Sequence, residues 1–119
     1  MNRNDRLDKL YKEIPEINCK GLCHTTCGII PCSEAEQARI NEKLGIDFQQ
    51  KQMDDIAKGN LTCPALVDKR CSIYEIRPTV CRLYGNVSKM KCMYGCTPKK
   101  YLPERKSRKL IKKIDAIKV

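Results

Sequence analysis

Cysteine is the residue type with the most chemistry to offer in this chain. Nine cysteines occur among 119 residues, together with one histidine and no tryptophan. They form an N-terminal run, a middle group and a late pair, which are Cys19, Cys23, Cys27 and Cys32, then Cys63, Cys71 and Cys81, then Cys92 and Cys96. Thiols at this density either pair as disulfides in an oxidising compartment or bind metal in a reducing one.

The N-terminal sequence favours metal over disulfides. Residues 1–8 contain no apolar stretch that could serve as a signal peptide, and no window approaches the roughly 20 apolar residues of a membrane span. We therefore expect an intracellular, cytoplasm-like reducing compartment and no transmembrane segment. Nine is also an odd number, so a disulfide-paired monomer would leave one thiol over, whereas two four-thiolate sites and one spare cysteine account for all nine.

The spacing of the thiols bears on which metal they hold. Cys19, Cys23 and Cys27 lie four residues apart, and closely spaced thiolates completed by a distant cysteine resemble iron–sulfur ligation, such as that of a 4Fe-4S cluster. Zinc stays open, because structural zinc sites use pairs of cysteines two to four residues apart, as in Cys92 and Cys96. The expected cofactor is an iron–sulfur cluster or zinc, with iron–sulfur slightly favoured. The alternative that single cysteines are merely buried apolar residues also stays open.

Helical periodicity and capping residues predict three helices before the middle cysteines. Asn4 and Pro15 bracket a short amphipathic helix over about residues 5–14. Ser33 with Glu36 forms a capping box for a helix over 34–44, which Gly45 ends. Asp47 and Gln50 repeat the pattern for a helix over about 48–58, whose expected core residues are Phe48, Met53, Ile56 and Ala57.

The rest of the chain divides into irregular and helical parts. Prolines and glycines interrupt residues 63–96, so we expect turns and short helical pieces there. Pro103 opens a basic amphipathic helix with Leu110, Ile111, Ile114 and Ile117 on one side. The expected fold is a small, mainly α, metal-organised domain with irregular cysteine-rich loops and little or no sheet. Residues 1–98 would form the metal-binding domain and residues 99–119 the C-terminal helix.

Two motifs among the middle cysteines resemble a known family. A Cys-Pro-x-Leu step occupies residues 63–66, and a Cys-x-Ile-Tyr-Glu-x-Arg-Pro-x-x-Cys-Arg signature occupies residues 71–82. Together with the N-terminal cysteine run and the helix that begins after a serine, they resemble the YkgJ-like cysteine-cluster family of zinc- or iron-chelating domains. The resemblance covers about residues 19–96. The chain departs from the family pattern at its start, where family members carry a tighter run that includes an adjacent cysteine pair.

The resemblance implies a set of metal ligands. It assigns this role to Cys19, Cys23, Cys27, Cys63, Cys71, Cys81, Cys92 and Cys96. Cys32 matches no family ligand, which makes it the best candidate for the spare thiol. Arg77 and Arg82 would offset the charge of the thiolates, and Tyr74 would pack beside them. Surface solvation or pairing with Glu75 is the alternative for both arginines.

The charge of the chain is concentrated at its C-terminal end. The net charge is +10, of which residues 99–119 carry +7. Nucleic acid or an acidic protein surface is therefore an expected partner, and the chain could belong to a larger assembly. The expected contacts are Lys99, Lys100, Arg105, Lys106, Arg108, Lys109, Lys112 and Lys113. The alternative is a helix that docks on its own domain and leaves a solvated charged face.

These patterns lead to three hypotheses for function. The chain has no Gly-rich phosphate loop, paired-carboxylate motif or zinc-protease sequence, so an independent enzyme is not expected, although the question stays open. The leading hypothesis is a small metal-binding protein that acts as a structural or interaction module. The first alternative is a redox or metal-delivery iron–sulfur protein, and the second is a zinc-dependent nucleic-acid-binding module.

Overall fold

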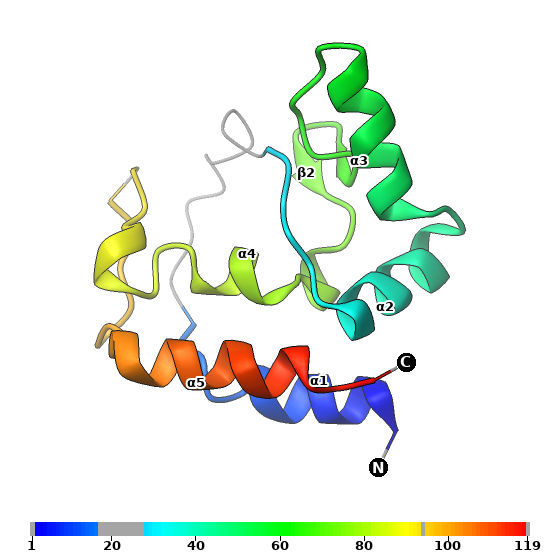
Figure 1. Cartoon of the computed structure of the whole chain (residues 1–119). Coiled ribbons are helices and arrows are strands. Elements are labelled where there is room, and N and C mark those ends of the chain that lie inside the picture. The colour runs from blue at the N-terminus through cyan, green and yellow to red at the C-terminus, as the bar shows by residue number, and fades with distance from the viewer. Residues whose placement is uncertain (1, 17–27, 94, 119) are drawn as a thin grey trace.

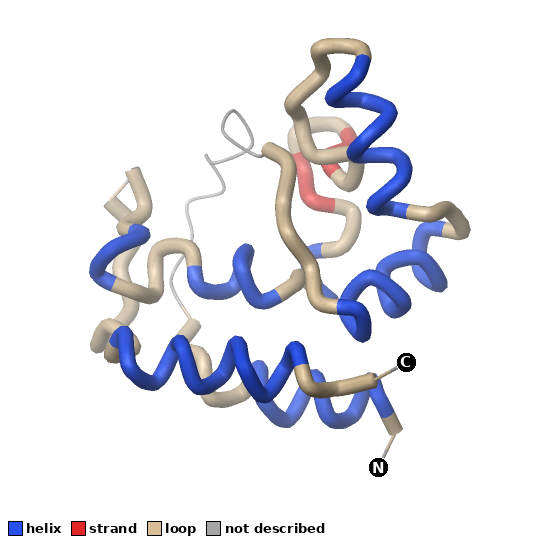
Figure 2. The backbone as a smooth tube through the Cα atoms, viewed as in Figure 1, coloured by secondary structure: helices blue, strands red, loops and turns tan. Residues whose placement is uncertain are grey.

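Helices dominate the computed structural model, which describes residues 2–16, 28–93 and 95–118 (Figure 1 and Figure 2). The elements in chain order are α1 (Arg3–Tyr11), α2 (Glu34–Leu44), α3 (Phe48–Ala57), β1 (Leu66–Val67), β2 (Arg70–Cys71), the 3-10 turn η2 (Tyr74–Ile76), α4 (Thr79–Leu83), the 3-10 turn η3 (Ser88–Met90) and α5 (Glu104–Asp115). The two strands pair as an antiparallel hairpin. The expected mainly α fold with little sheet is confirmed. No helix in the described part of the chain is both long and apolar enough to cross a membrane.

Helix α1 begins and ends earlier than its sequence pattern predicts. The Asn2 side chain accepts a hydrogen bond from the Asp5 backbone nitrogen at 2.8 Å, so Asn2 caps the helix and Asn4 lies inside it. The helix ends at Tyr11, and Ile14 lies beyond it while remaining buried. The expected bounds of 5–14 were wrong because the hydrophobic spacing continues past the last helical turn.

Helix α2 has the expected bounds, and its capping box is complete. The Glu36 backbone nitrogen donates to Ser33 Oγ at 3.2 Å, and the Ser33 backbone nitrogen donates to Glu36 Oε1 at 3.0 Å. Gly45 ends the helix with a φ of 69°, a left-handed conformation that glycine adopts without strain.

Helix α3 is also where its capping residue predicts, but its buried face is different from the one expected. Phe48 is buried, whereas Met53 and Ile56 are 56% and 45% exposed. The prediction that these two residues belong to the core was wrong. Gln52 is buried in their place, because its side-chain amide donates to and accepts from the backbone of Ile30 at 3.1 and 2.9 Å. These two bonds turn the polar side of α3 toward the protein.

The apolar interior consists of two separate clusters. The first lies between α1, α4 and α5 and includes Leu7, Tyr11, Leu83, Leu110 and Ile114. Figure 1 shows α5 running alongside α1 in the opposite direction. The second cluster joins α2, α3 and the hairpin, and it is built from Ile40, Phe48, Cys63, Ala65 and Ile73.

A buried carboxylate connects three of the helices. Glu36 is 3% exposed, and its Oε2 accepts hydrogen bonds from Tyr11 Oη at 2.5 Å, the Thr79 backbone nitrogen at 2.5 Å and Thr79 Oγ1 at 2.7 Å. These donors come from α1 and from the first turn of α4. Burial and, next, the neighbouring Glu36 charge raise the pKa of Tyr11, so the phenol stays a donor at neutral pH.

Removing this charge should destabilise the fold. In Glu36→Gln the bonds to Tyr11 and Thr79 lose their charge assistance, and an amide group is placed where donors already point. We expect a loss of about 2 kcal/mol in the free energy of unfolding, measured by urea denaturation. Glu34→Gln is the control, because Glu34 lies on the same helix with an exposed side chain, and it should cost under about 0.5 kcal/mol. Equal effects of the two changes would contradict a special role for Glu36.

The packing of α5 can be tested with two adjacent residues. Leu110 is 2% exposed in the first cluster, whereas Ile111 is 39% exposed. Leu110→Ala should lower the free energy of unfolding by about 2–5 kcal/mol, because it leaves a cavity, and Ile111→Ala should lower it by less than about 1 kcal/mol. Thermal or urea unfolding of both variants measures the difference. Similar losses would mean that α5 is not held through this face.

Candidate metal centre

Four cysteines from four different segments lie near one another. Cys32 precedes α2, Cys63 precedes the hairpin, Cys71 ends β2 and Cys81 lies in α4. Cys32 is close enough to Cys63 and Cys81 for their charges to affect its pKa, and Cys81 is affected in the same way by Cys63 and Cys71. The fold therefore brings together thiols that are up to about fifty residues apart in the sequence.

The local surroundings of these thiols favour the protonated form. Burial raises the pKa of Cys32 to about 12, with a further contribution from Glu36. Burial likewise raises the pKa of Cys81 to about 12, with the neighbouring thiols adding to it. The pKa of Cys71 is also raised by burial, but a hydrogen bond from the Ile73 backbone and the charge of Arg77 oppose that shift. A metal ion that binds here must displace protons from these thiols.

A tight hairpin places Cys71 beside the segment that carries Cys63. Leu66 pairs with Cys71 across the two strands, and the turn residues Asp68 and Lys69 have φ values of 49° and 64°, as expected for a two-residue hairpin turn. The Ser72 hydroxyl and backbone nitrogen both donate to the Ala65 carbonyl, at 2.6 and 2.8 Å. The sequence analysis predicted only turns here, although the Asp-Lys pair between Val67 and Arg70 is the signal that was available.

Helix α4 presents Cys81 because its first turn is anchored. Pro78 precedes the helix, and Thr79 donates its backbone and hydroxyl groups to Glu36. Glu36 also lies near enough to Cys32 and Cys81 to raise the pKa of both thiols. The sequence analysis recognised Glu36 only as a helix cap, since a capping box reports local hydrogen bonds and not distant neighbours.

The two arginines of the signature have different surroundings. The Arg77 guanidinium lies 3.9 Å from the centre of the Tyr74 ring, and its charge lowers the pKa of Cys71 and Cys81 against the effect of burial. The buried Arg77 Nε has no hydrogen-bond partner among the described residues. Arg82 donates to the carbonyls of Arg77 at 2.7 Å and Glu75 at 3.0 Å, and it stacks on Tyr11 at 3.9 Å. Arg77 thus faces the thiols, while Arg82 holds the loop before α4.

The remaining predicted residues lie elsewhere. The segment that contains Cys92 and Cys96 is at the opposite end of α4 from the hairpin (Figure 1). Cys96 is buried there, and the Met93 backbone nitrogen donates to Tyr84 Oη at 3.3 Å. Cys19, Cys23 and Cys27 lie outside the described residues. The predicted basic contacts are exposed, on α5 or just before it: Lys99, Lys100, Arg105, Lys106, Arg108, Lys109, Lys112 and Lys113.

The donor chemistry of the gathered thiols fits zinc or iron. Both metals take thiolate ligands, and the nearby Arg77 charge offsets part of the negative charge that such a site accumulates. Within residues 2–16, 28–93 and 95–118, no three cysteine, histidine or acidic side chains converge closely enough to hold a metal ion by themselves. Gly28, which follows Cys27 in the sequence, forms an isolated β-bridge with Thr62, which precedes Cys63. This bridge attaches the chain at the end of the N-terminal cysteine run to the Cys63 segment.

Comparison with known proteins identifies a family for this arrangement. Residues 18–99, more than half of the chain, match the family model CxxCxxCC, described as "Putative zinc- or iron-chelating domain". No curated protein and no solved structure matches the chain. The match spans all nine cysteines and ends before α5. The chain therefore belongs to the CxxCxxCC family of zinc- or iron-chelating domains, which is the family that its cysteine motifs resemble.

Proposed function

We propose that this protein holds a thiolate-bound metal centre that organises its fold, with an iron–sulfur cluster favoured over zinc. The observation that carries the proposal is the gathering of Cys63, Cys71 and Cys81 from three segments around one buried region. Metal ions of this class contribute on the order of 10 kcal/mol to the folding of small domains, which is comparable with the whole stability of such a domain. The bound centre would supply that cross-link.

The proposed ligands are Cys63, Cys71 and Cys81 together with cysteines of the N-terminal run. The bridge between Gly28 and Thr62 supports this set, because it ties the run to the segment of Cys63. Clusters of iron and sulfur take four thiolates, and three of them are accounted for by the described cysteines. The fourth would come from Cys19, Cys23 or Cys27. Cys92 and Cys96 remain predicted ligands on the sequence pattern.

Charge distinguishes Cys32 from the three proposed ligands. Cys71 and Cys81 have the Arg77 guanidinium as a neighbour, which stabilises a thiolate. After burial, the strongest influence on Cys32 is the carboxylate of Glu36, which disfavours a thiolate. We therefore assign Cys32 as the spare thiol that packs against the second hydrophobic cluster.

A structural role is supported by the position of the thiols between the two apolar clusters. Cys63 and Cys71 belong to or pack against the second cluster, whereas Cys81 lies two residues before Leu83 of the first. A metal bound by all three would join the clusters through covalent coordination. Because each cluster is small, such a joint would stabilise the whole domain more than either cluster could alone.

One observation favours a redox or metal-delivery protein as a second candidate. The buried Arg77 Nε lies without a hydrogen-bond partner in the described structure, beside the proposed ligands. Donors that point at cluster sulfurs are among the features that set the reduction potential of iron–sulfur proteins. An electron-transfer role would use this donor, whereas a purely structural zinc site would not require it.

Protein purified without oxygen should be brown. We expect broad visible absorption that bleaches on reduction, and iron and acid-labile sulfide in equal amounts, measured by metal analysis on the same sample. Air-purified protein that is reconstituted anaerobically is the matched control. Colourless protein with stoichiometric zinc would contradict the iron–sulfur assignment, and folded protein without any metal would overturn the proposal as a whole.

Two serine substitutions test which thiols bind. Cys81→Ser should weaken metal binding by more than the about 10–100-fold that the loss of an outer hydrogen-bond partner costs, because it removes a direct ligand. Cys32→Ser should leave the metal content and the visible spectrum unchanged, since Cys32 faces Glu36 instead of Arg77. Both variants are compared by metal content per chain after the same purification. Loss of metal in Cys32→Ser would make Cys32 a ligand.

A further inference from the structure

Helix α5 uses its apolar residues inside the protein. Leu110, Ile114 and Ile117 are buried in the cluster with α1. An amphipathic helix that binds a membrane must lay its apolar face into the lipid, and this face is already occupied. What α5 offers to a partner is therefore almost entirely charge.

The outward surface of α5 is densely cationic. Six of its twelve residues are lysine or arginine and all six are exposed: Arg105, Lys106, Arg108, Lys109, Lys112 and Lys113. None of these six forms an ion pair with any described residue. The nearby ion pair of Lys89 with Glu104, at 2.9 Å, does not involve them. These cations are consequently available to an anion from solution.

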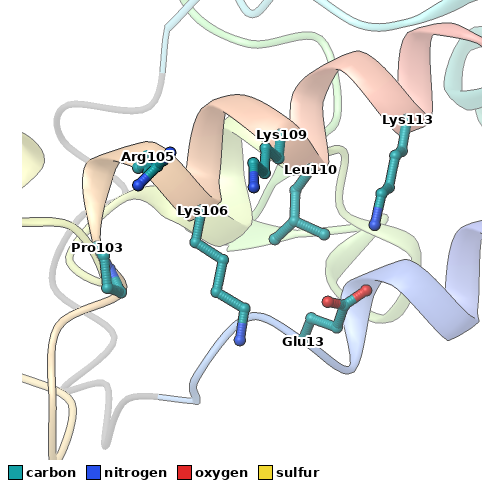
Figure 3. A pocket seen from close by; sticks show the side chains of 7 residues that line it. All are labelled: Glu13, Pro103, Arg105, Lys106, Lys109, Leu110 and Lys113. Carbon is teal, nitrogen blue, oxygen red and sulfur yellow. The ribbon is translucent and has the colours of Figure 1, made fainter.

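A groove of about 320 Å³ lies between α5 and the segment that follows α1 (Figure 3). Lys106 and Lys113 extend from α5 on either side of Leu110, toward the segment that carries Glu13. A second hollow continues the groove past Lys106 and adds Lys100 and Tyr101 to its lining. The two hollows form a continuous channel with positive rims and one carboxylate.

The composition of this surface favours phosphates over an acidic protein. Lysine is depleted at the core of protein–protein interfaces, where aromatic residues and methionine are enriched, yet four of the six exposed cations of α5 are lysines. Phosphate groups of nucleic acids are bound by lysine and arginine without any apolar anchor. Tyr101 is the sole aromatic residue of the two hollows, so base recognition by stacking would be limited.

We propose that α5 and its groove bind the phosphate backbone of single-stranded nucleic acid independently of base sequence. Lys106 and Lys113 contact successive phosphates in the groove, and the other cations of α5 add a wider electrostatic field. Glu13 opposes this binding, because its carboxylate lies where phosphates would enter. The proposal requires no metal in the contact itself, so it stands apart from the identity of the metal centre.

The test compares variants of the purified, metal-loaded full chain. Binding to a fluorescent 20-nucleotide single-stranded RNA is measured by anisotropy at several salt concentrations. Lys106→Gln with Lys113→Gln should weaken binding about tenfold and lower the slope of log K against log salt by about 1.5. Glu13→Gln should strengthen binding about twofold, because a like charge leaves the groove.

The controls separate a specific surface from net charge. Lys58→Gln with Lys69→Gln removes the same charge from exposed positions after α3 and in the hairpin turn, and it should change the affinity by less than about twofold. Equal loss in both double variants, or unchanged affinity in Glu13→Gln, would overturn the proposal. Tighter binding of a polyglutamate peptide of matched charge would overturn it in favour of an acidic protein partner. Circular dichroism and metal content confirm that every variant is folded.

Discussion

The burial of one carboxylate, Glu36, is the interaction on which the rest of this structure depends. A buried charge is costly unless hydrogen bonds replace its water shell, and here the donors come from α1, α4 and the start of α2. Three helices that share few direct apolar contacts are thereby held at one point. Because Thr79 is two residues before Cys81, the same bonds that anchor α4 also place a thiol.

Opposite charges flank the gathered thiols. Glu36 lies on the side of Cys32, and the Arg77 guanidinium lies on the side of Cys71 and Cys81. Thiols in otherwise similar burial thus differ in how readily they become thiolates. Tyr74 and Arg82 keep Arg77 in place, the first by stacking on its guanidinium and the second by binding its carbonyl. The signature of residues 71–82 therefore builds the site and its electrostatic surroundings together.

Helix α5 combines two roles that a single amphipathic pattern could not distinguish. Its inner stripe closes the first hydrophobic cluster against α1, and its outer surface carries unpaired cations. The matched family region ends at residue 99, before α5 begins. The charge of this helix is thus a feature of the chain beyond its chelating domain, even though the helix is packed into the same fold.

The sequence by itself determined the features that depend on near neighbours along the chain. The capping box of Ser33 and Glu36 and the cap at Asp47 gave the starts of α2 and α3, because each is a hydrogen bond across three residues. The spacing of the later cysteines likewise identified the family.

Only the tertiary structure decided which residues meet across long separations. The bond of Glu36 to Thr79 spans forty-three residues, and no local pattern encodes it. The same is true of Cys32 beside Cys81, and of Gln52, whose bonds to Ile30 turn α3 so that Met53 and Ile56 face outward. Periodicity shows that a helix has an apolar side, but the side that becomes buried is chosen by the polar groups that find partners when the chain packs.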